Sequence, residues 1–272
     1  MKIKFSKIVY SIILFIIFTI FFLEREFIVS YIKYISESAP KKVNDTNFPK
    51  IVHLIYFPWD KTGKLKNNEN DFNHDFYETF KNNNSEWEVR LWTLSKIKSF
   101  LSTNYPIYSD IWKIVKHPVQ AVDFCRLIVT YHYGGIYWQY DSVQKVPLEA
   151  FIPPKNKSIR LFIENIVPKF KCIINGYEKI RQYKSEEVIR VATQVFSAYP
   201  KNDFLLHCIN KSWDNLHKFT VESQYDILYI GGNAMISEAY DEYSKKDDIH
   251  LTYCTIDYIK LSSNGSWRID KY

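Results

Sequence analysis

Apolar residues beyond residue 47 recur with the period of a strand in some stretches and with that of a helix in others. An apolar, β-branched run predicts a buried strand over 48–57, and alternation predicts a second strand over 86–92. Helical spacing follows over 94–102, and a long amphipathic helix is predicted from Pro118 to Tyr133. Further expected elements are a surface loop at 60–73, strands at 160–166 and 249–253, and helices at 202–218 and 234–243. Strands that alternate with helices predict an α/β domain with a mostly parallel sheet.

The stretch GGIYWQYDSV, residues 134–143, is typical of a glycine helix stop followed by a short strand. Alternation along that strand places Tyr137, Gln139 and Asp141 on one side of the chain. Because ligands of parallel α/β sheets bind at the carboxyl ends of strands, these polar groups predict a binding site. The other interpretation of Asp141 is a carboxylate that caps a turn.

Asp123 and Arg126 lie three residues apart on the predicted helix and therefore share a face. An ordinary ion pair within the helix is the plain interpretation. A ligand site is favoured because this helix leads directly into the stretch that carries Tyr137 and Asp141.

The N-terminus predicts a membrane anchor. Lys2, Lys4 and Lys7 precede the uncharged run Ile8 to Leu23, which as a helix would rise roughly 24 Å. Cationic residues before the run favour a cytosolic N-terminus and a lumenal domain, in the Golgi or endoplasmic reticulum. A cleaved signal peptide is the alternative, but no small-residue cleavage site follows. The expected organisation is a cytosolic tail at 1–7, a single span at 8–23, a stem at 24–47 and a globular domain at 48–272.

Composition narrows the function classes. The chain has 272 residues, 46% of them hydrophobic, which is enough for one sizeable core. Its net charge of +6 comes from scattered lysines, so nucleic-acid binding is not expected. The four cysteines have no metal-site spacing, which leaves buried thiols and lumenal disulfides both open. Asn-x-Ser/Thr acceptor sites for glycans begin at Asn44, Asn83, Asn156, Asn210 and Asn264.

The segment HPVQAVDFCRLIVTYHYGGIYWQYDSV resembles the Asp-x-Asp (DXD) sugar-binding segment of family 32 glycosyltransferases. That family includes fungal initiating mannosyltransferases, inositolphosphoceramide mannosyltransferases and α-1,4-galactosyltransferases. Its opening strand is similar to FPKIVHLIY, its second strand to WEVRLWT and its closing element to NGSW at 264–267. The residues that match the central pattern are Asp123, Arg126, Gly134, Gly135, Ile136, Tyr137 and Asp141.

The resemblance implies a glycosyltransferase A fold that binds a UDP- or GDP-hexose with Mn²⁺ or Mg²⁺. It also implies transfer of the sugar, with retention, to a glycan, glycoprotein or glycolipid. Relatives that act on inositolphosphoceramide usually carry further spans after the catalytic domain, and this chain has none there. The expectation therefore shifts towards glycan or glycoprotein acceptors.

Two positions depart from the family pattern. Gln139 stands where the family has its first aspartate, so it keeps a carbonyl acceptor for a ribose hydroxyl but removes a negative charge near the cation. The histidine that often precedes the closing element is absent, and the serines or the asparagine of 262–266 would have to replace it. A weakened metal site is expected.

The resemblance also assigns roles. Asp141 would bind the metal, with Ser266 as a second ligand, and Asp123 and Arg126 would hold the sugar and phosphate of the donor. The residues expected to contact substrate beside that pair are Tyr56, Tyr137, Gln139, Gly232, Asn233 and Trp267. Core packing is an equal alternative for Tyr56 and for Trp267, and a plain turn is the alternative for Gly231-Gly232-Asn233. His53, inside an apolar strand, is expected to be structural.

Two other function classes stay open. The first is a catalytically weak protein that binds a nucleotide-sugar or a glycan through a degenerate motif. The second is an anchored structural protein, which the presence of Asp123, Arg126, Tyr137 and Asp141 disfavours.

Overall fold

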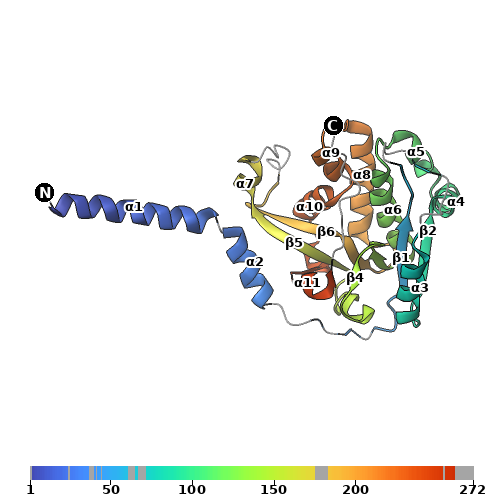
Figure 1. The fold of residues 1–272 in the computed structure, drawn as a ribbon. Helices are drawn as coiled ribbons and strands as arrows, with labels where there is room; N and C mark the ends of the chain where they lie inside the picture. Colours follow the sequence, from blue (N-terminus) through green and yellow to red (C-terminus); the bar gives the residue numbers. More distant parts are fainter. Residues whose placement is uncertain are drawn as a thin grey trace.

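The computed structural model describes residues 2–23, 25–36, 40, 42–43, 45–60, 65–66, 72–174, 183–253 and 255–260. Helices and strands alternate along most of this length (Figure 1). The strands are β1 Ile51–Tyr56, β2 Glu88–Thr93, β3 Gly135–Trp138, β4 Val143–Gln144, β5 Ile159–Pro168, β6 Glu187–Ala198, β7 Ile249–Thr252 and β8 Ile259–Lys260. The α-helices are α1 Lys2–Leu23, α2 Arg25–Ser36, α3 His74–Asn83, α4 Leu94–Asn104, α5 Ile111–Ile114, α6 Pro118–Tyr133, α7 Lys169–Ile174, α8 Asp203–Lys218, α9 Gln224–Ile230, α10 Asn233–Glu242 and α11 Thr255–Tyr258. Short 3-10 helices lie at Pro106–Tyr108, Leu148–Phe151 and Lys246–Asp248.

The main sheet has the strand order β2-β1-β3-β6-β5-β7. Strand β1 pairs in parallel with β2 and with β3, and β5 pairs in parallel with β7. Only β6 runs in the opposite direction, antiparallel to both of its neighbours. The predicted α/β domain with a mostly parallel sheet is therefore confirmed. Because the chain passes from β1 to β2 and then returns to β3 on the other side of β1, the strand order switches between β1 and β3.

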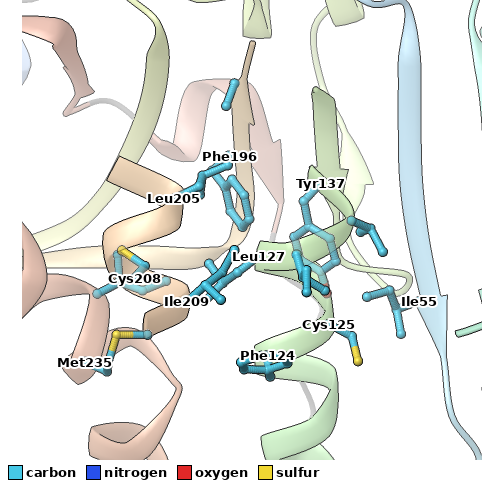
Figure 2. Close-up of a cluster of buried hydrophobic side chains, with 14 of the residues drawn as sticks. Ile55, Phe124, Cys125, Leu127, Tyr137, Phe196, Leu205, Cys208, Ile209 and Met235 are labelled. Carbon is cyan, nitrogen blue, oxygen red and sulfur yellow. The ribbon is translucent and has the colours of Figure 1, made fainter. Parts of the chain in front are cut away.

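Two layers of side chains hold the sheet in place. On one face, Tyr137 and Phe196 from neighbouring strands stack with their rings 5.4 Å apart. Figure 2 shows them among apolar side chains of α6 and α8, including Leu127 and Ile209. The other face buries a second cluster that includes Trp138 of β3. Both faces of β3 are thus covered, which explains its continuous apolar sequence.

Two consecutive glycines form the connection between α6 and β3. Gly134 ends the helix with φ of 68°, and Gly135 begins the strand with φ of 92°, values that favour glycine. A Cβ atom on Gly135 would lie 2.4 Å from the carbonyl oxygen of Ile51 in β1, so the close approach of the two strands also requires glycine there. The helix stop expected from the sequence is confirmed at these residues.

His53 of β1 stabilises the same connection through hydrogen bonds. Its Nε2 lies 2.8 Å from the carbonyl oxygen of Gly134, and the indole N–H of Trp92 donates to its Nδ1 at 3.0 Å. The ring is therefore the neutral Nε2–H tautomer, with both nitrogens bonded. Burial lowers the pKa of His53 to about 3. The structural role expected for this histidine is confirmed.

Sequence pattern located several elements well and missed others. The helix from Pro118 to Tyr133 has the predicted bounds, and β1, β2, α4 and α8 lie where they were expected. The antiparallel strand β6 and the helices α3 and α9 were not predicted. The strand expected within 134–143 is shorter than the pattern indicated: it ends at Trp138, and the chain then turns.

Near the N-terminus, α1 extends away from the globular part (Figure 1). Its apolar side chains between Val9 and Phe18 are exposed. Within the described residues, no helix meets the length and apolarity that a bilayer span requires. The segment expected to form a stem contains α2, which packs along β5. Arg25 of α2 forms an ion pair of 2.9 Å with Glu187 of β6.

The cysteines that the structure describes, Cys125, Cys172 and Cys208, are buried free thiols. Burial raises the pKa of the Cys125 and Cys208 thiols, so both stay protonated and behave as apolar core groups. Cys254 lies outside the described residues.

Candidate functional site

The candidate site lies beyond the end of β3, alongside the part of its neighbour β6 that extends past β3. Among the described residues, 195–198 of β6 pair with β3, and the edge of β6 over 187–194, here called the open edge, has no strand paired with it on that side. The backbone N–H of Gln139 donates to the carbonyl oxygen of Gln194 at 2.7 Å, and Arg126 Nη1 donates to that of Thr193 at 2.9 Å. Helix α10 also lies against this edge, where Ser237 Oγ accepts from the N–H of Val191 at 3.0 Å. The edge therefore joins the DXD-like turn to α6 and α10.

The turn after β3 brings Gln139 and Asp141 together. The N–H of Ser142 donates to the carbonyl oxygen of Gln139 at 3.0 Å, and the indole of Trp138 donates to that of Ser142 at 3.1 Å. The side-chain amide of Gln139 donates to Asp141 Oδ1 at 2.6 Å. The predicted alternation of an extended strand is wrong here, because a turn rather than a strand aligns these two half-buried residues.

Asp123 and Arg126 form a buried ion pair. Arg126 Nη2 lies 2.5 Å from Asp123 Oδ1, and the residues are only 4% and 5% exposed, respectively. Burial raises the pKa of Asp123, and the guanidinium of Arg126 opposes that shift. Arg126 also lies over the ring of Tyr137, with Cζ 5.6 Å from the centroid, and burial raises the pKa of Tyr137 to about 12. The pair and Tyr137 thus form one packed unit beneath the turn.

Gly232 and Asn233 reach the same place from a distant part of the sequence. A Cβ atom on Gly232 would lie 3.3 Å from Asp123 Oδ2 and 2.9 Å from Cα of Leu228, so glycine allows α10 to begin close to the carboxylate. Asn215 of α8 donates to the carbonyl oxygen of Tyr229 at 3.1 Å and holds the end of α9. Asn233, the first residue of α10, follows Gly232 directly and is half-buried.

Tyr56 ends β1 on the other side of the switch in strand order. It is half-buried and packs against Tyr140 of the turn, with ring centroids 5.5 Å apart, and against Phe72 at 5.2 Å. The hydroxyl of Tyr140 accepts from the N–H of Asn73 at 2.7 Å, which links the turn to the start of α3. The structure therefore places Tyr56 at the edge of the site, while its contact with a nucleotide base stays a prediction.

Sequence reasoning missed three residues around the open edge. Glu164 of β5 faces Arg190 and Gln194 of β6, and Asn233 of α10 reaches the same carboxylate. No sequence motif identifies these positions. Strand β6 was not predicted, and the direction of the Glu164 side chain depends on a local irregularity in the pairing of β5. Of the residues that were predicted, Ser266 and Trp267 lie outside the described part of the chain.

A divalent cation fits the site if the donor supplies most of its ligands. No group of three or more His, Cys, Asp or Glu residues suited to a metal occurs among the described residues. Asp141 offers one carboxylate, and one of its oxygens already accepts from Gln139. Magnesium-type sites commonly use one or two carboxylates together with substrate phosphates and water, which this arrangement allows.

Comparison with known proteins finds similarity to one family over this part of the chain. Residues 71–159 match the family model described as "Glycosyltransferase sugar-binding region containing DXD motif". That range contains Asp123, Arg126, Tyr137, Gln139 and Asp141. The resemblance to family 32 glycosyltransferases is confirmed. Gln139 is therefore a departure within the matched glycosyltransferase region itself.

Curated relatives agree with the resemblance to family 32. The chain is 25% identical over 182 residues to "Inositol phosphoceramide mannosyltransferase 1" of Schizosaccharomyces pombe, a match that covers 67% of this chain and 46% of that protein. It is 26% identical over 122 residues to "Mannosyl phosphorylinositol ceramide synthase SUR1" of Saccharomyces cerevisiae, covering 42% of this chain and 32% of that protein. The chain thus spans less than half the length of these relatives.

Among solved structures, "PaToxG Glycosyltransferase" overlaps with a TM-score of 0.39 at 17% identity, covering 71% of this chain and 68% of that one. A similarity this low does not establish a shared fold.

Proposed function

We propose that the protein is a glycosyltransferase of type A fold that transfers a hexose from a nucleotide-sugar with retention. The observation that supports this most is the meeting of three distant segments at one edge of the sheet. The Asp123–Arg126 pair, the Gly232–Asn233 junction and the turn with Gln139 and Asp141 all lie near the open edge of β6. This position lies beyond the carboxyl end of β3, next to the switch in strand order between β1 and β3, and α/β sheets bind ligands at such switches.

In the proposed reaction, an acceptor hydroxyl attacks the anomeric carbon of the donor sugar. A bond forms between that carbon and the acceptor oxygen, and the bond from the carbon to the diphosphate oxygen breaks. The hydroxyl proton passes to the departing diphosphate, and attack on the face from which it departs retains the configuration. Asp123 and Arg126 would orient the sugar through hydrogen bonds, and Gln139 would hold a ribose hydroxyl.

Mn²⁺ or Mg²⁺, when bound, would neutralise charge on the diphosphate as it leaves. Asp141 would hold that cation from the protein side, and Gln139 would fix the orientation of the carboxylate. Ser266 is proposed as a second ligand from the C-terminal segment, and Trp267 as a cover for the sugar.

The names of the two relatives indicate which donor and which acceptor should be tested first. Both relatives are named for mannosyl transfer to an inositol-phosphate ceramide. We therefore propose GDP-mannose as the first donor and a glycolipid as the first acceptor, with glycans and glycoproteins as further candidates.

We also propose that α1 anchors the protein with its domain in the lumen of the Golgi or endoplasmic reticulum. In a eukaryotic secretory system, the exposed acceptor residues Asn83, Asn156 and Asn210 are available for glycosylation. Glycans sensitive to an endoglycosidase are expected on at least one of them. A domain that carries no glycan and is cleaved by protease outside sealed microsomes would contradict this topology.

The enzymatic proposal is tested with a panel of UDP- and GDP-sugars in the presence of Mn²⁺. Release of free nucleoside diphosphate by the wild type and loss of this activity in Asp141→Asn would support the proposal. Tight donor binding without hydrolysis or transfer to any acceptor would favour the second candidate, a nucleotide-sugar-binding protein. The loss of an aspartate at position 139 is the observation that keeps that candidate open.

A further inference from the structure

Glu164 lies on an irregular part of β5 beside the candidate site. Ile163 pairs with Val191 and Asn165 pairs with Arg190, so Glu164 is an extra residue without a partner in the ladder. Such β-bulges redirect a side chain and are frequent next to active sites. Here the bulge lies at the part of the β5–β6 hairpin where β3 has already ended.

The Glu164 carboxylate contacts three hydrogen-bond donors. Arg190 Nη2 lies 3.3 Å from Oε2, and the side-chain amide of Asn233 donates to the same oxygen at 3.3 Å. The side-chain amide of Gln194 donates to Oε1, also at 3.3 Å. One anion therefore bridges β6 and the start of α10.

A carboxylate can only accept hydrogen bonds, so it decides which way a neighbouring amide is oriented. With its NH₂ group on Glu164, Asn233 presents its carbonyl oxygen away from that carboxylate. Gln194 is oriented in the same manner, and its Oε1 is buried without a hydrogen-bond partner, so no competing contact fixes that amide. A reversed amide would bring two acceptor oxygens together at either position.

We infer that Glu164 is a positioning residue that fixes the amide of Asn233 so that its carbonyl oxygen receives a hydroxyl of the sugar. The backbone of Asn233 is already held, since its carbonyl oxygen accepts from Ser237 Oγ at 2.6 Å. The remaining freedom is the rotation of the side-chain amide, and Glu164 removes it. This inference rests on the proposed function for the identity of the ligand, but the amide orientation does not depend on that function.

The test uses the full chain in detergent, labelled with ¹⁵N on asparagine and glutamine. Glu164→Gln keeps the size of the side chain but adds a donor, so the side-chain amide signals of Asn233 and Gln194 should both move. Glu187→Gln is the matched control, because Glu187 is on the same hairpin and pairs with the distant Arg25. That control should leave both signals in place, and unchanged melting temperatures would show that both variants are folded.

Donor affinity is the second readout, measured with the sugar nucleotide that the wild type binds best. Glu164→Gln should weaken that affinity about tenfold, the order expected when a hydrogen bond to a charged group no longer fixes a ligand contact. In an Asn233→Ala background the same change should have almost no effect, because Glu164 acts through Asn233.

The two readouts separate the claims. An Asn233 signal that stays unchanged in Glu164→Gln would overturn the positioning role, whether or not any sugar nucleotide binds. A moved signal with unchanged donor affinity would overturn its connection to the sugar. A wild type that binds no nucleotide-sugar would overturn the proposed function, while the amide signals would still decide the orientation.

Discussion

Gln139 donates its side-chain amide to Asp141 Oδ1 at 2.6 Å, at the position where the family has an aspartate. Two carboxylates so close together would repel each other in the absence of a cation. Glutamine replaces that repulsion with a hydrogen bond to a charged acceptor. The turn thus gains an internal hydrogen bond and lacks one negative charge that would attract a cation.

Replacing Gln139 with aspartate is predicted to lower the stability of the metal-free protein and to raise its affinity for a divalent cation. Without metal, the two carboxylates should lower the melting temperature relative to the wild type. The added charge should increase the affinity for Mn²⁺ by one or two factors of ten. A unit charge about 4 Å from a divalent ion gains a raw attraction of roughly 8 kcal/mol at a dielectric of about 20, and solvation offsets most of this energy. Calorimetric titration and thermal melting with and without Mn²⁺ measure both effects.

Asp141→Asn is the matched control for that experiment. It keeps the shape of the turn but removes its carboxylate, so metal-dependent donor binding should be abolished. If Asp141→Asn binds donor as the wild type does, and Gln139→Asp binds Mn²⁺ no better, the turn is not a metal site.

The buried ion pair gives a separate prediction. Asp123→Asn leaves Arg126 as an uncompensated buried charge, so it should lower the free energy of unfolding by about 3–5 kcal/mol. The double variant Asp123→Leu, Arg126→Met should recover most of that loss, because neither charge is left unpaired. Urea unfolding measures both values.

Activity distinguishes the two roles of this pair. If Asp123 and Arg126 hold the donor, the stable double variant should show no donor hydrolysis. A double variant that is both stable and active would identify an ordinary structural ion pair.

The sequence predicted the site best where local pattern and geometry coincide. The helix from Pro118 to Tyr133 has strong start and stop signals, so Asp123 and Arg126 could be placed correctly beside the stretch that follows. Gln139 and Asp141 were expected to lie on one side of an extended strand, and a turn brings them together instead. Two residues separated by one position can meet in either conformation, and alternation alone does not distinguish them.

What escaped prediction depends on contacts between distant segments. Strand β6 has buried apolar residues on both faces, interrupted by polar residues such as Arg190 and Gln194, so its pattern shows no clear period. Glu164 points to the site only because β5 has a bulge, which the register of two strands determines. The nearness of Gly232 to Asp123 likewise follows from the packing of α9 against α6 and of α10 against α9, not from either local sequence.

Gly135→Ala should be strongly destabilising. Alanine at φ of 92° is strained, and its Cβ would lie 2.4 Å from the carbonyl oxygen of Ile51, a backbone atom that cannot move aside without separating β1 from β3. A loss of about 3 kcal/mol or more is expected from the strain and the displaced strand. Gly231→Ala is the control, since its φ is not positive and its Cβ would lie 3.2 Å from the hydroxyl of Ser212 and 3.4 Å from the Cβ of Asp123, both side-chain atoms. Equal unfolding free energies for the two variants would contradict this account.

His53 should make the fold sensitive to acid. Burial lowers its pKa to about 3, whereas an unfolded chain titrates near 6.5, so only the unfolded state takes up a proton between these values. Stability is therefore complete above about pH 6.5 and declines as the pH falls towards 3; at pH 5 the loss from this residue is about 2 kcal/mol. His53→Gln keeps a donor for Gly134 and an acceptor for Trp92 but does not titrate, so its unfolding free energy should depend less on pH over that range.

His250, whose pKa burial also lowers, to about 4, is present in both proteins and cancels in the comparison. Urea unfolding from pH 7.5 to 5 measures the difference, and parallel pH profiles for the two proteins would show that His53 is not the buried group responsible.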